Sequence, residues 1–300
     1  MALLKPDGTP LISDANQILG NGTNGLVLKC GAHALKAPKI RDTSILDCEM
    51  LEDQLYVNEV NIATLETEKA VYKRVGRCDG IADCIASSEE GILLVYYKRG
   101  DAATFLEREK ELGWSVKARW ILSVMQAVSQ LHRAKLLIYD IALRNFLVAD
   151  DGLSLRMIDF GQCSLFPLDT ADITAVSDNG LTAQVDLFHL GSTIYSIAVW
   201  KRYENDLLNH EFQLPPIKDL PDVGHLPCGD IIKKCWTGRY RDAGEVYSEA
   251  QQLFRERRAA TISTKTRILQ IGLILIPLIT VYPYMKPFLF WLKSKTNRLR

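Results

Sequence analysis

The sequence has no net charge and lacks the patterns that mark zinc-bound or secreted proteins. Its 36 basic residues balance 36 acidic ones, so we expect no general attraction to nucleic acid and no nucleic-acid partner. The seven cysteines form no C-x-x-C pair, and the spacing of cysteine, histidine and carboxylate residues predicts no zinc site. No signal-peptide pattern opens the chain, which predicts reduced thiols in the cytosol or nucleus rather than a disulfide framework.

Apolar residues, in contrast, are plentiful. They make up 47% of the 300 residues, enough for the core of one large domain or of two lobes. One segment carries no charge from Ile268 to Tyr284, and basic residues flank the wider apolar region. A membrane-spanning helix needs about 20 mostly apolar residues. Residues 268–292 therefore predict a C-terminal membrane anchor on a cytosol-facing protein. The alternative is a terminal helix that packs on a globular domain of a cytoplasmic protein.

Three polar side chains stand among apolar residues near the middle of the chain: Asp140, Asn145 and Asp159. Between the second and the third, two apolar runs flank Asp151-Gly152, which predicts a β-hairpin. The hairpin would bring Asn145 beside Asp159, where two oxygen ligands could hold Mg²⁺ and leave Asp140 free to meet a hydroxyl. Each of these residues alone is more often a turn former. The joint pattern of D-x-x-x-x-N, hairpin and D-F-G favours a site.

Near the N-terminus, Gly20, Gly22 and Gly25 form a G-x-G-x-x-G motif. The motif alone is a weak signal, because dinucleotide-binding folds also carry it; there, however, the third glycine opens a helix. Here a short β-prone stretch containing Val27 follows, then a turn and a second strand that carries Lys36. This order predicts a flap over the phosphates of a nucleotide, with Val27 among the binding residues.

Lys36 has two interpretations. Most lysines are simply exposed, but this one lies on a strand of the predicted flap, where a long cation would reach phosphates beneath the loop. It then needs a carboxylate to hold it. A helix predicted over residues 57–75 offers three candidates, Glu59, Glu66 and Glu68.

Six motifs occur along residues 14–258 in the order and at spacings compatible with those of the protein kinases, which they resemble. The chain resembles a divergent, fungal kinase-like member of that superfamily. The resemblance implies an α+β fold of two lobes that bind ATP between them. The β-rich N-lobe would span residues 14–98 after a lead-in over residues 1–13, and the larger helical C-lobe residues 99–258. A basic linker and the predicted anchor would occupy residues 259–300.

The resemblance also implies roles for individual residues in the N-lobe. The three glycines would lie over the phosphates, and Lys36 would contact the α- and β-phosphates. Glu68 would orient Lys36, because its distance from the following strand resembles the family's spacing; Glu66 is the second candidate. Tyr97 lies at the start of a polar connector that resembles the hinge where backbone groups meet adenine.

In the C-lobe the resemblance implies that Asp140 positions the acceptor hydroxyl while Asn145 and Asp159 hold Mg²⁺. Asp186 resembles the family's buried carboxylate that accepts backbone N–H groups of the catalytic loop. The segment from Asp140 to Asn145 is similar to the tyrosine-kinase D-L-A-A-R-N, so Arg144 is a candidate for the role of the lysine that Ser/Thr kinases carry two residues after the aspartate.

Two family motifs are altered. The family's H-R-D is Ile138-Tyr139-Asp140 here, and the A-P-E that closes the activation segment is absent. We therefore weigh three functions: an active ATP-dependent protein kinase with a protein substrate, favoured by the complete set of Lys, Glu, Asp, Asn and Asp; a nucleotide-binding pseudokinase scaffold; and a small-molecule phosphotransferase of related fold. Six residues do not distinguish Ser/Thr from Tyr acceptors.

Overall fold

The computed structural model describes residues 2–11, 17–170, 173, 182–205, 207 and 213–260. They belong to two compact units, Met1–Ala250 and Gln251–Arg300. Of the second unit, residues 251–260 are described, and they are helical. The predicted anchor at residues 268–292 lies outside the described residues. Among the residues that are described, no helix is long and apolar enough to cross a membrane.

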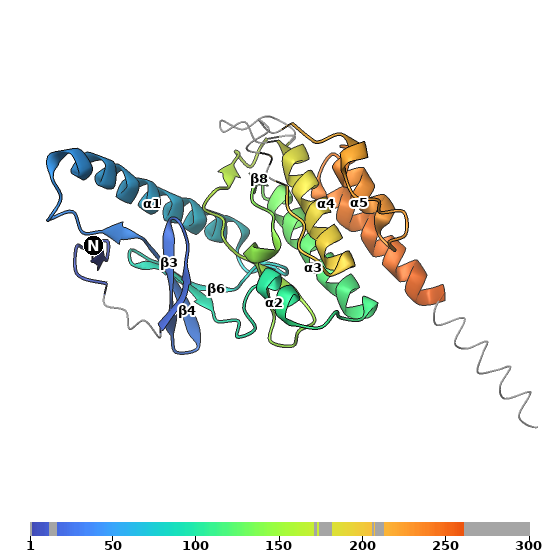
Figure 1. Cartoon of the computed structure of the whole chain (residues 1–300), viewed down its shortest axis with the longest axis horizontal. Helices are drawn as coiled ribbons and strands as arrows, with labels where there is room; N and C mark the ends of the chain where they lie inside the picture. The colour runs from blue at the N-terminus through green and yellow to red at the C-terminus, as the bar shows by residue number, and fades with distance from the viewer. Residues whose placement is uncertain are drawn as a thin grey trace, which may run out of the picture. The chain divides into compact units, whose positions relative to one another are not determined.

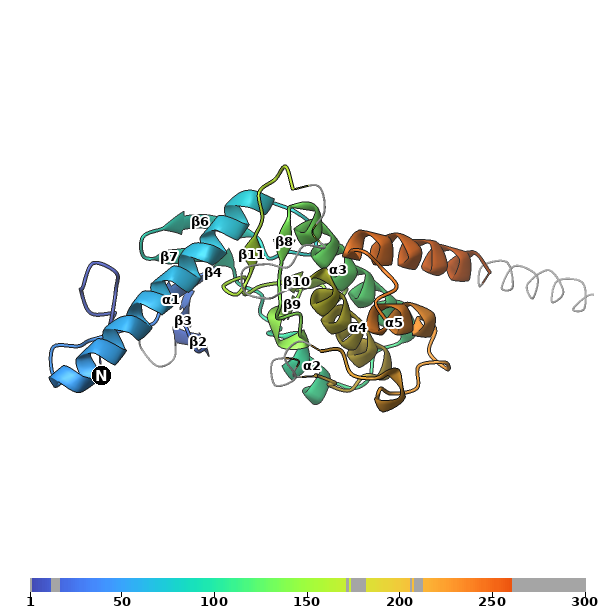
Figure 2. The ribbon, with the colours of Figure 1, turned by 90° about the horizontal axis from the view of Figure 1, so that it is seen from above.

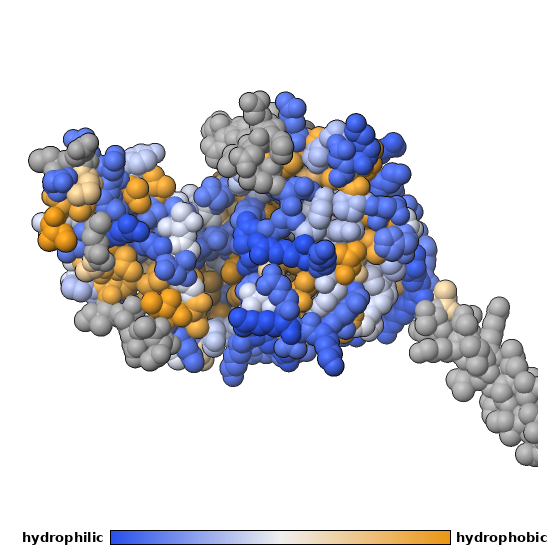
Figure 3. Space-filling model, in the orientation of Figure 1, coloured by the Kyte–Doolittle hydropathy of each residue, from blue (hydrophilic) through white to orange (hydrophobic). Residues whose placement is uncertain are grey.

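An antiparallel sheet of five strands, in the order β2-β3-β4-β7-β6, forms one part of the first unit (Figure 1). Its strands are β2 (Ile18–Asn21), β3 (Gly25–Cys30), β4 (His33–Pro38), β6 (Cys84–Ser88) and β7 (Gly91–Val95). Side chains alternate along β3, so that Leu26 and Leu28 are buried. Gly31 has a φ of +64°, which allows the tight turn from β3 to β4. In Figure 3, apolar side chains gather over this part, whereas the helical part presents mostly hydrophilic side chains.

The long helix α1 (Cys48–Val75) packs beside this sheet (Figure 2). It begins well before the predicted residue 57, because the carboxylate of Asp47 caps it by accepting the Met50 N–H. Its first half meets the chain after β4 through amides rather than apolar groups. Asn61 Nδ2 donates to Lys39 O at 2.8 Å. About one turn earlier in the helix, Asn58 accepts the Arg41 N–H and donates to Arg41 O, both at 2.9 Å.

The other part of the first unit is helical, and α3 and α4 lie side by side in it with α5 next to them (Figure 2). Its helices are α2 (Ala102–Arg108), α3 (Trp114–Arg133), α4 (Ala183–Val199), α5 (Gly229–Trp236), a helical stretch at residues 243–250, and 3₁₀ turns at Leu143–Asn145 and Ile217–Asp219. The sequence of residues 114–134 predicts an amphipathic helix with apolar residues at spacings of three and four, and this apolar face of α3 is confirmed: its members are fully buried. They are Trp120, Ile121, Val124, Val128 and Leu131.

The predicted hairpin is present and connects the two parts. Its strands β9 (Phe146–Val148) and β10 (Leu155–Met157) pair antiparallel, and Ala82 N, just before β6, donates to Met157 O at 2.9 Å. Two further pairs are short. They join β1 (Leu3–Leu4) to β5 (Ile40–Arg41) and β8 (Leu136–Leu137) to β11 (Ser164–Leu165). A five-stranded sheet joined to a bundle of helices fits the predicted two-lobed α+β fold.

Candidate active site

A cavity of about 500 Å³ opens between the sheet and the helical part, within the size range of nucleotide and other ligand pockets. Residues predicted to bind the nucleotide all line it: Gly20, Gly22, Gly25, Val27, Lys36, Glu68 and Tyr97. Asp140, Arg144 and Asp159 line it as well. Asn145 is buried and contacts Asp140. The structure therefore brings the whole predicted set together.

The glycine loop forms a narrow turn between β2 and β3. The Gly22 N–H donates to Gly25 O at 3.0 Å, and Lys39 Nζ donates to Gly22 O from outside the turn. Gly25 is the glycine with least room, since a Cβ there would lie 3.2 Å from Ala37 O. A larger residue at this position would push the loop away from β4 and from the Lys36 stem beneath it.

Lys36 is held between two carboxylates. Its Nζ donates to Glu68 Oε2 and to Asp159 Oδ1, the second at 2.8 Å. Glu66 instead pairs with Lys69 on the same helix. Burial alone would lower the pKa of Lys36, but the charges of Glu68 and Asp159 outweigh it and raise that pKa, so the ammonium group stays charged.

The segment after β10 turns sharply at Asp159. Its φ of +68° is unusual for a residue with a side chain. Phe160, next in the chain, is fully buried and packs edge-on against Tyr72 of α1 at 5.2 Å between ring centroids. Gly161 then passes so close to Thr64 that a Cβ would lie 2.3 Å from its Cγ2. These contacts fix the Asp159 carboxylate relative to α1, and therefore relative to Glu68.

Both oxygens of the Asp140 carboxylate accept hydrogen bonds. Arg144 Nη2 donates to Oδ1, and Asn145 Nδ2 donates to Oδ2 at 2.8 Å and to the Asp140 backbone oxygen at 2.9 Å. The 3₁₀ turn after Ala142 places both donors beside Asp140. Because the Asn145 nitrogen is directed at Asp140, its Oδ1 is the atom left for a cation.

Asp186 holds the backbone of the loop that leads to Asp140, as the resemblance to kinases implied. Its fully buried carboxylate accepts the backbone N–H groups of Ile138 and Tyr139 at 2.8 and 2.7 Å. Tyr139 has a φ of +72°, and His189 Nδ1 hydrogen bonds its carbonyl oxygen at 2.6 Å. His132 in turn holds Asp186. Its Nδ1 accepts the Ala243 N–H, so the ring proton is on Nε2, which donates it to the Asp186 carboxylate.

The donor set fits Mg²⁺ only together with phosphates. Within the described ranges, no group of three or more His, Cys, Asp or Glu side chains could hold a metal ion. Mg²⁺, however, is commonly held by one or two protein carboxylates while phosphate oxygens and waters fill its other positions. Asp159, with a half-exposed carboxylate, and Asn145 Oδ1 match this pattern, and the Asn145 O to Ile158 N hydrogen bond of 2.9 Å keeps the two segments adjacent.

Sequence reasoning missed several residues around the cavity. Leu147 and Ile158 of the hairpin region, Thr64 of α1 and Gln162 also line it. The alternation in the hairpin could have indicated Leu147, since it is flanked by the buried Phe146 and Val148. No local signal marks Thr64 or Gln162, because their positions depend on how α1 meets the loop after Asp159.

A comparison with protein families agrees with this geometry. The model of the protein kinase domain matches residues 13–213, which is more than half of the chain. A sheet joined to a helical part with a cavity between them fits this class of protein, and the chain belongs to the protein kinase family.

Curated relatives are similar over shorter stretches. The leaf rust 10 disease-resistance locus receptor-like protein kinase-like 1.2 of Arabidopsis thaliana is 28% identical over 39% of this chain and 20% of its own length. Wall-associated receptor kinase 4 of the same plant is 24% identical over 54% of this chain and 22% of its own length. A probable serine/threonine-protein kinase of Dictyostelium discoideum is 29% identical over 35% and 21%. The chain thus spans about a fifth of the length of these relatives.

Proposed function

We propose that this chain is an ATP-dependent protein kinase that transfers the γ-phosphoryl group of Mg-ATP to a hydroxyl of a protein substrate. One observation carries the proposal. Lys36, held by Glu68 and Asp159, and Asp140, held by Asn145 and Arg144, line the same cavity under one glycine loop. This is the combination of a fixed cation and an oriented carboxylate that phosphoryl transfer requires.

Each residue has a task in this reaction. Lys36 contacts the α- and β-phosphates, and Asn145 Oδ1 and Asp159 would hold Mg²⁺, which when bound neutralises phosphate charge. Asp140 orients the acceptor hydroxyl and takes its proton. The hydroxyl oxygen bonds to the γ-phosphorus, the bond from that phosphorus to the bridging oxygen breaks, and ADP leaves with the electron pair.

The acceptor has a separate place to bind. A second cavity of about 530 Å³ lies over the 3₁₀ turn and the end of α4. It shares Asp140, Arg144 and Gln162 with the first cavity. An acceptor in the second cavity would therefore meet a nucleotide in the first across Asp140, which supports transfer to a hydroxyl that enters from the second cavity.

The decisive test measures Mg-ATP turnover and Mg-ATP binding for the wild type, Asp140→Asn and Lys36→Met. We expect Asp140→Asn to bind nucleotide and lose about 10²–10⁴-fold in turnover, the usual contribution of a general base. Lys36→Met should lose turnover as well. Asp53→Asn and Lys73→Met, exposed on α1, are the matched controls and should behave as wild type.

The altered H-R-D favours a second candidate, a nucleotide-binding pseudokinase scaffold. Tyr139 stands where the family has arginine, so the cation that the family carries directly before the aspartate is replaced by an uncharged side chain here. For the scaffold we expect Mg-ATP binding with the same negligible turnover in all three proteins. That result would contradict the kinase proposal.

We also propose that residues 268–292 tether the kinase to a membrane with the catalytic part facing the cytosol. The uncharged run and the basic residues around it support this.

A further inference from the structure

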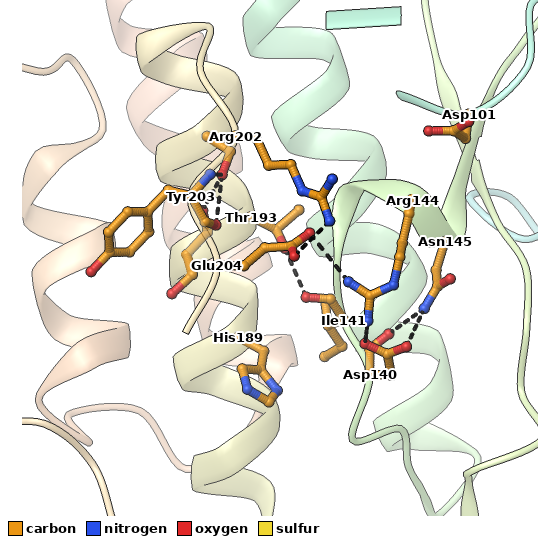
Figure 4. Close-up of polar contacts among 12 residues, drawn as sticks. Asp101, Asp140, Ile141, Arg144, Asn145, His189, Thr193, Arg202, Tyr203 and Glu204 are labelled. Carbon is orange, nitrogen blue, oxygen red and sulfur yellow. Dashed lines mark hydrogen bonds and ion pairs between the residues drawn. The ribbon is translucent and has the colours of Figure 1, made fainter. Parts of the chain in front are cut away.

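A chain of alternating charges leads away from Asp140 (Figure 4). The Arg144 guanidinium lies between two carboxylates: its Nη2 donates to Asp140, and its Nη1 donates to Glu204 Oε1 at 3.2 Å. Glu204 Oε2 in turn accepts a hydrogen bond from Arg202 Nη2 at 2.9 Å. Arg202 Nη1 finally lies 3.9 Å from Glu107. Glu204 belongs to none of the kinase motifs that the sequence contains.

Arg144 needs this second carboxylate to hold a single orientation. Its side chain is 45% exposed, and an exposed ion pair four residues along the chain contributes at most about 1 kcal/mol. A planar guanidinium that binds one carboxylate through each terminal nitrogen is fixed in both position and plane. With Glu204 present, the Arg144 plane is set, and the direction in which it holds Asp140 Oδ1 is set with it.

Glu204 is itself presented by a folded connection after α4. The helix ends at Trp200, whose φ of +55° turns the chain back. The Tyr203 N–H then donates to Ser196 Oγ at 3.0 Å, and the Tyr203 ring packs on Tyr195. This fold of the chain directs the next residue, Glu204, toward Arg144.

Glu204 also belongs to one side of the site only. It lines the second cavity and not the first, whereas Arg144 lines both. A residue placed in this way acts on the acceptor side of Asp140, and among the described residues its contact with Arg144 is the one that leads to the first cavity.

We propose that Glu204 is a positioning residue that fixes Arg144, so that Arg144 orients Asp140 toward an acceptor hydroxyl entering from the second cavity. This inference rests on the proposed kinase function. It identifies an acidic residue in the connection after α4 as part of the machinery that aligns the acceptor.

The test is steady-state kinetics of Glu204→Gln with a generic protein acceptor and Mg-ATP. We expect kcat to fall about fivefold, the effect of losing about 1 kcal/mol of ion pairing, while KM for ATP is unchanged. Glu107→Gln is the matched control, because Glu107 contacts Arg202 and not Arg144; its kcat should equal that of wild type. Thermal unfolding of both variants checks that the fold is retained.

A double-mutant cycle then separates positioning from a merely structural role. If Glu204 acts through Arg144, Glu204→Gln should lower kcat in the wild type and have no further effect in Arg144→Gln. Equal kcat for Glu204→Gln and wild type, an additive loss in the double variant, or an equal loss in Glu107→Gln would each overturn this inference and leave the kinase proposal intact. Absence of turnover in the wild type would overturn both.

Discussion

Two residues with positive φ, Tyr139 and Asp159, mark the places where side-chain contacts override backbone preference. Tyr139 is held there because its N–H donates to Asp186 and its carbonyl accepts from His189. Asp159 is held because Phe160 beside it is locked in the core. Tyr139 lies next to Asp140, and Asp159 is itself a residue that we propose to take part in phosphoryl transfer. The strain at both positions is compensated by contacts from α1 and α4.

Tyr72 carries a polar atom that these contacts leave unused. Its hydroxyl is buried without a hydrogen-bond partner among the described residues, and burial, with the nearby charge of Glu68, raises its pKa. An unsatisfied buried hydroxyl is destabilising. Tyr72→Phe should therefore increase the free energy of unfolding by about 1 kcal/mol, measured by chemical denaturation, since the ring and its contact with Phe160 remain.

Tyr240→Phe is the matched control. Its hydroxyl donates to Glu249 at 3.0 Å, so removing it should decrease stability by about 1 kcal/mol. A loss of stability in Tyr72→Phe similar to that of the control would mean that the Tyr72 hydroxyl has a partner, and the prediction would be wrong.

At the scale of elements, some were predictable because their signals are local. The hairpin of β9 and β10 followed from Asp151-Gly152 between apolar runs, and α3 followed from its apolar period. The apolar side predicted for the helix over residues 57–75 was right only in part; its members were Val60, Ala63, Leu65, Val71 and Val75. Leu65 and Val71 are buried, but Val60 and Ala63 are exposed, because the first half of α1 is docked through amides such as Asn61 that hydrogen bond backbone groups. Apolar periodicity contains no information about such contacts.

The contact between α1 and the loop after Asp159 is tight enough to test. Gly161→Ala would place a Cβ 2.3 Å from Thr64 Cγ2, so either the Thr64 side chain must rotate and lose its hydrogen bond to Val60 O, or α1 and the loop must separate. We expect a loss of about 1–3 kcal/mol in the free energy of unfolding, as for overpacking in a core. Weaker Mg-ATP binding should accompany it, because Glu68 on α1 and Asp159 in the loop together hold Lys36.

Thr64→Ser provides the compensating change. It removes Cγ2 and keeps the hydroxyl that donates to Val60 O, so Thr64→Ser alone should be close to wild type. In combination with Gly161→Ala it should recover most of the lost stability in the same denaturation experiment. Wild-type stability of Gly161→Ala alone would show that α1 and the loop are not in firm contact.

At the scale of the whole molecule, the order of motifs along the sequence was sufficient to predict a cavity between a sheet and a helical part. It was insufficient to predict what surrounds Asp140. Asn145 and Arg144 are close to it in the chain, but Glu204 reaches Arg144 across 60 positions of sequence. Partners brought together by tertiary folding alone leave no periodic or local pattern, so the acceptor side emerged from the structure.

The proposed tether concerns how this site is presented to its substrates. Residues 268–292 carry a single charge, on Lys286, and in the proposed arrangement the lysine and arginine residues on both sides would lie at the surfaces of a bilayer. Cell fractionation of the full chain and of a chain ending at residue 261 tests this. We expect the full chain in the membrane fraction, released by detergent and not by salt, and the shortened chain in the supernatant.

Turnover of a free acceptor should be equal for both, because every residue that we assign to the site precedes residue 250. Recovery of the full chain in the supernatant without detergent would contradict the tether and favour a terminal segment that packs on the protein itself.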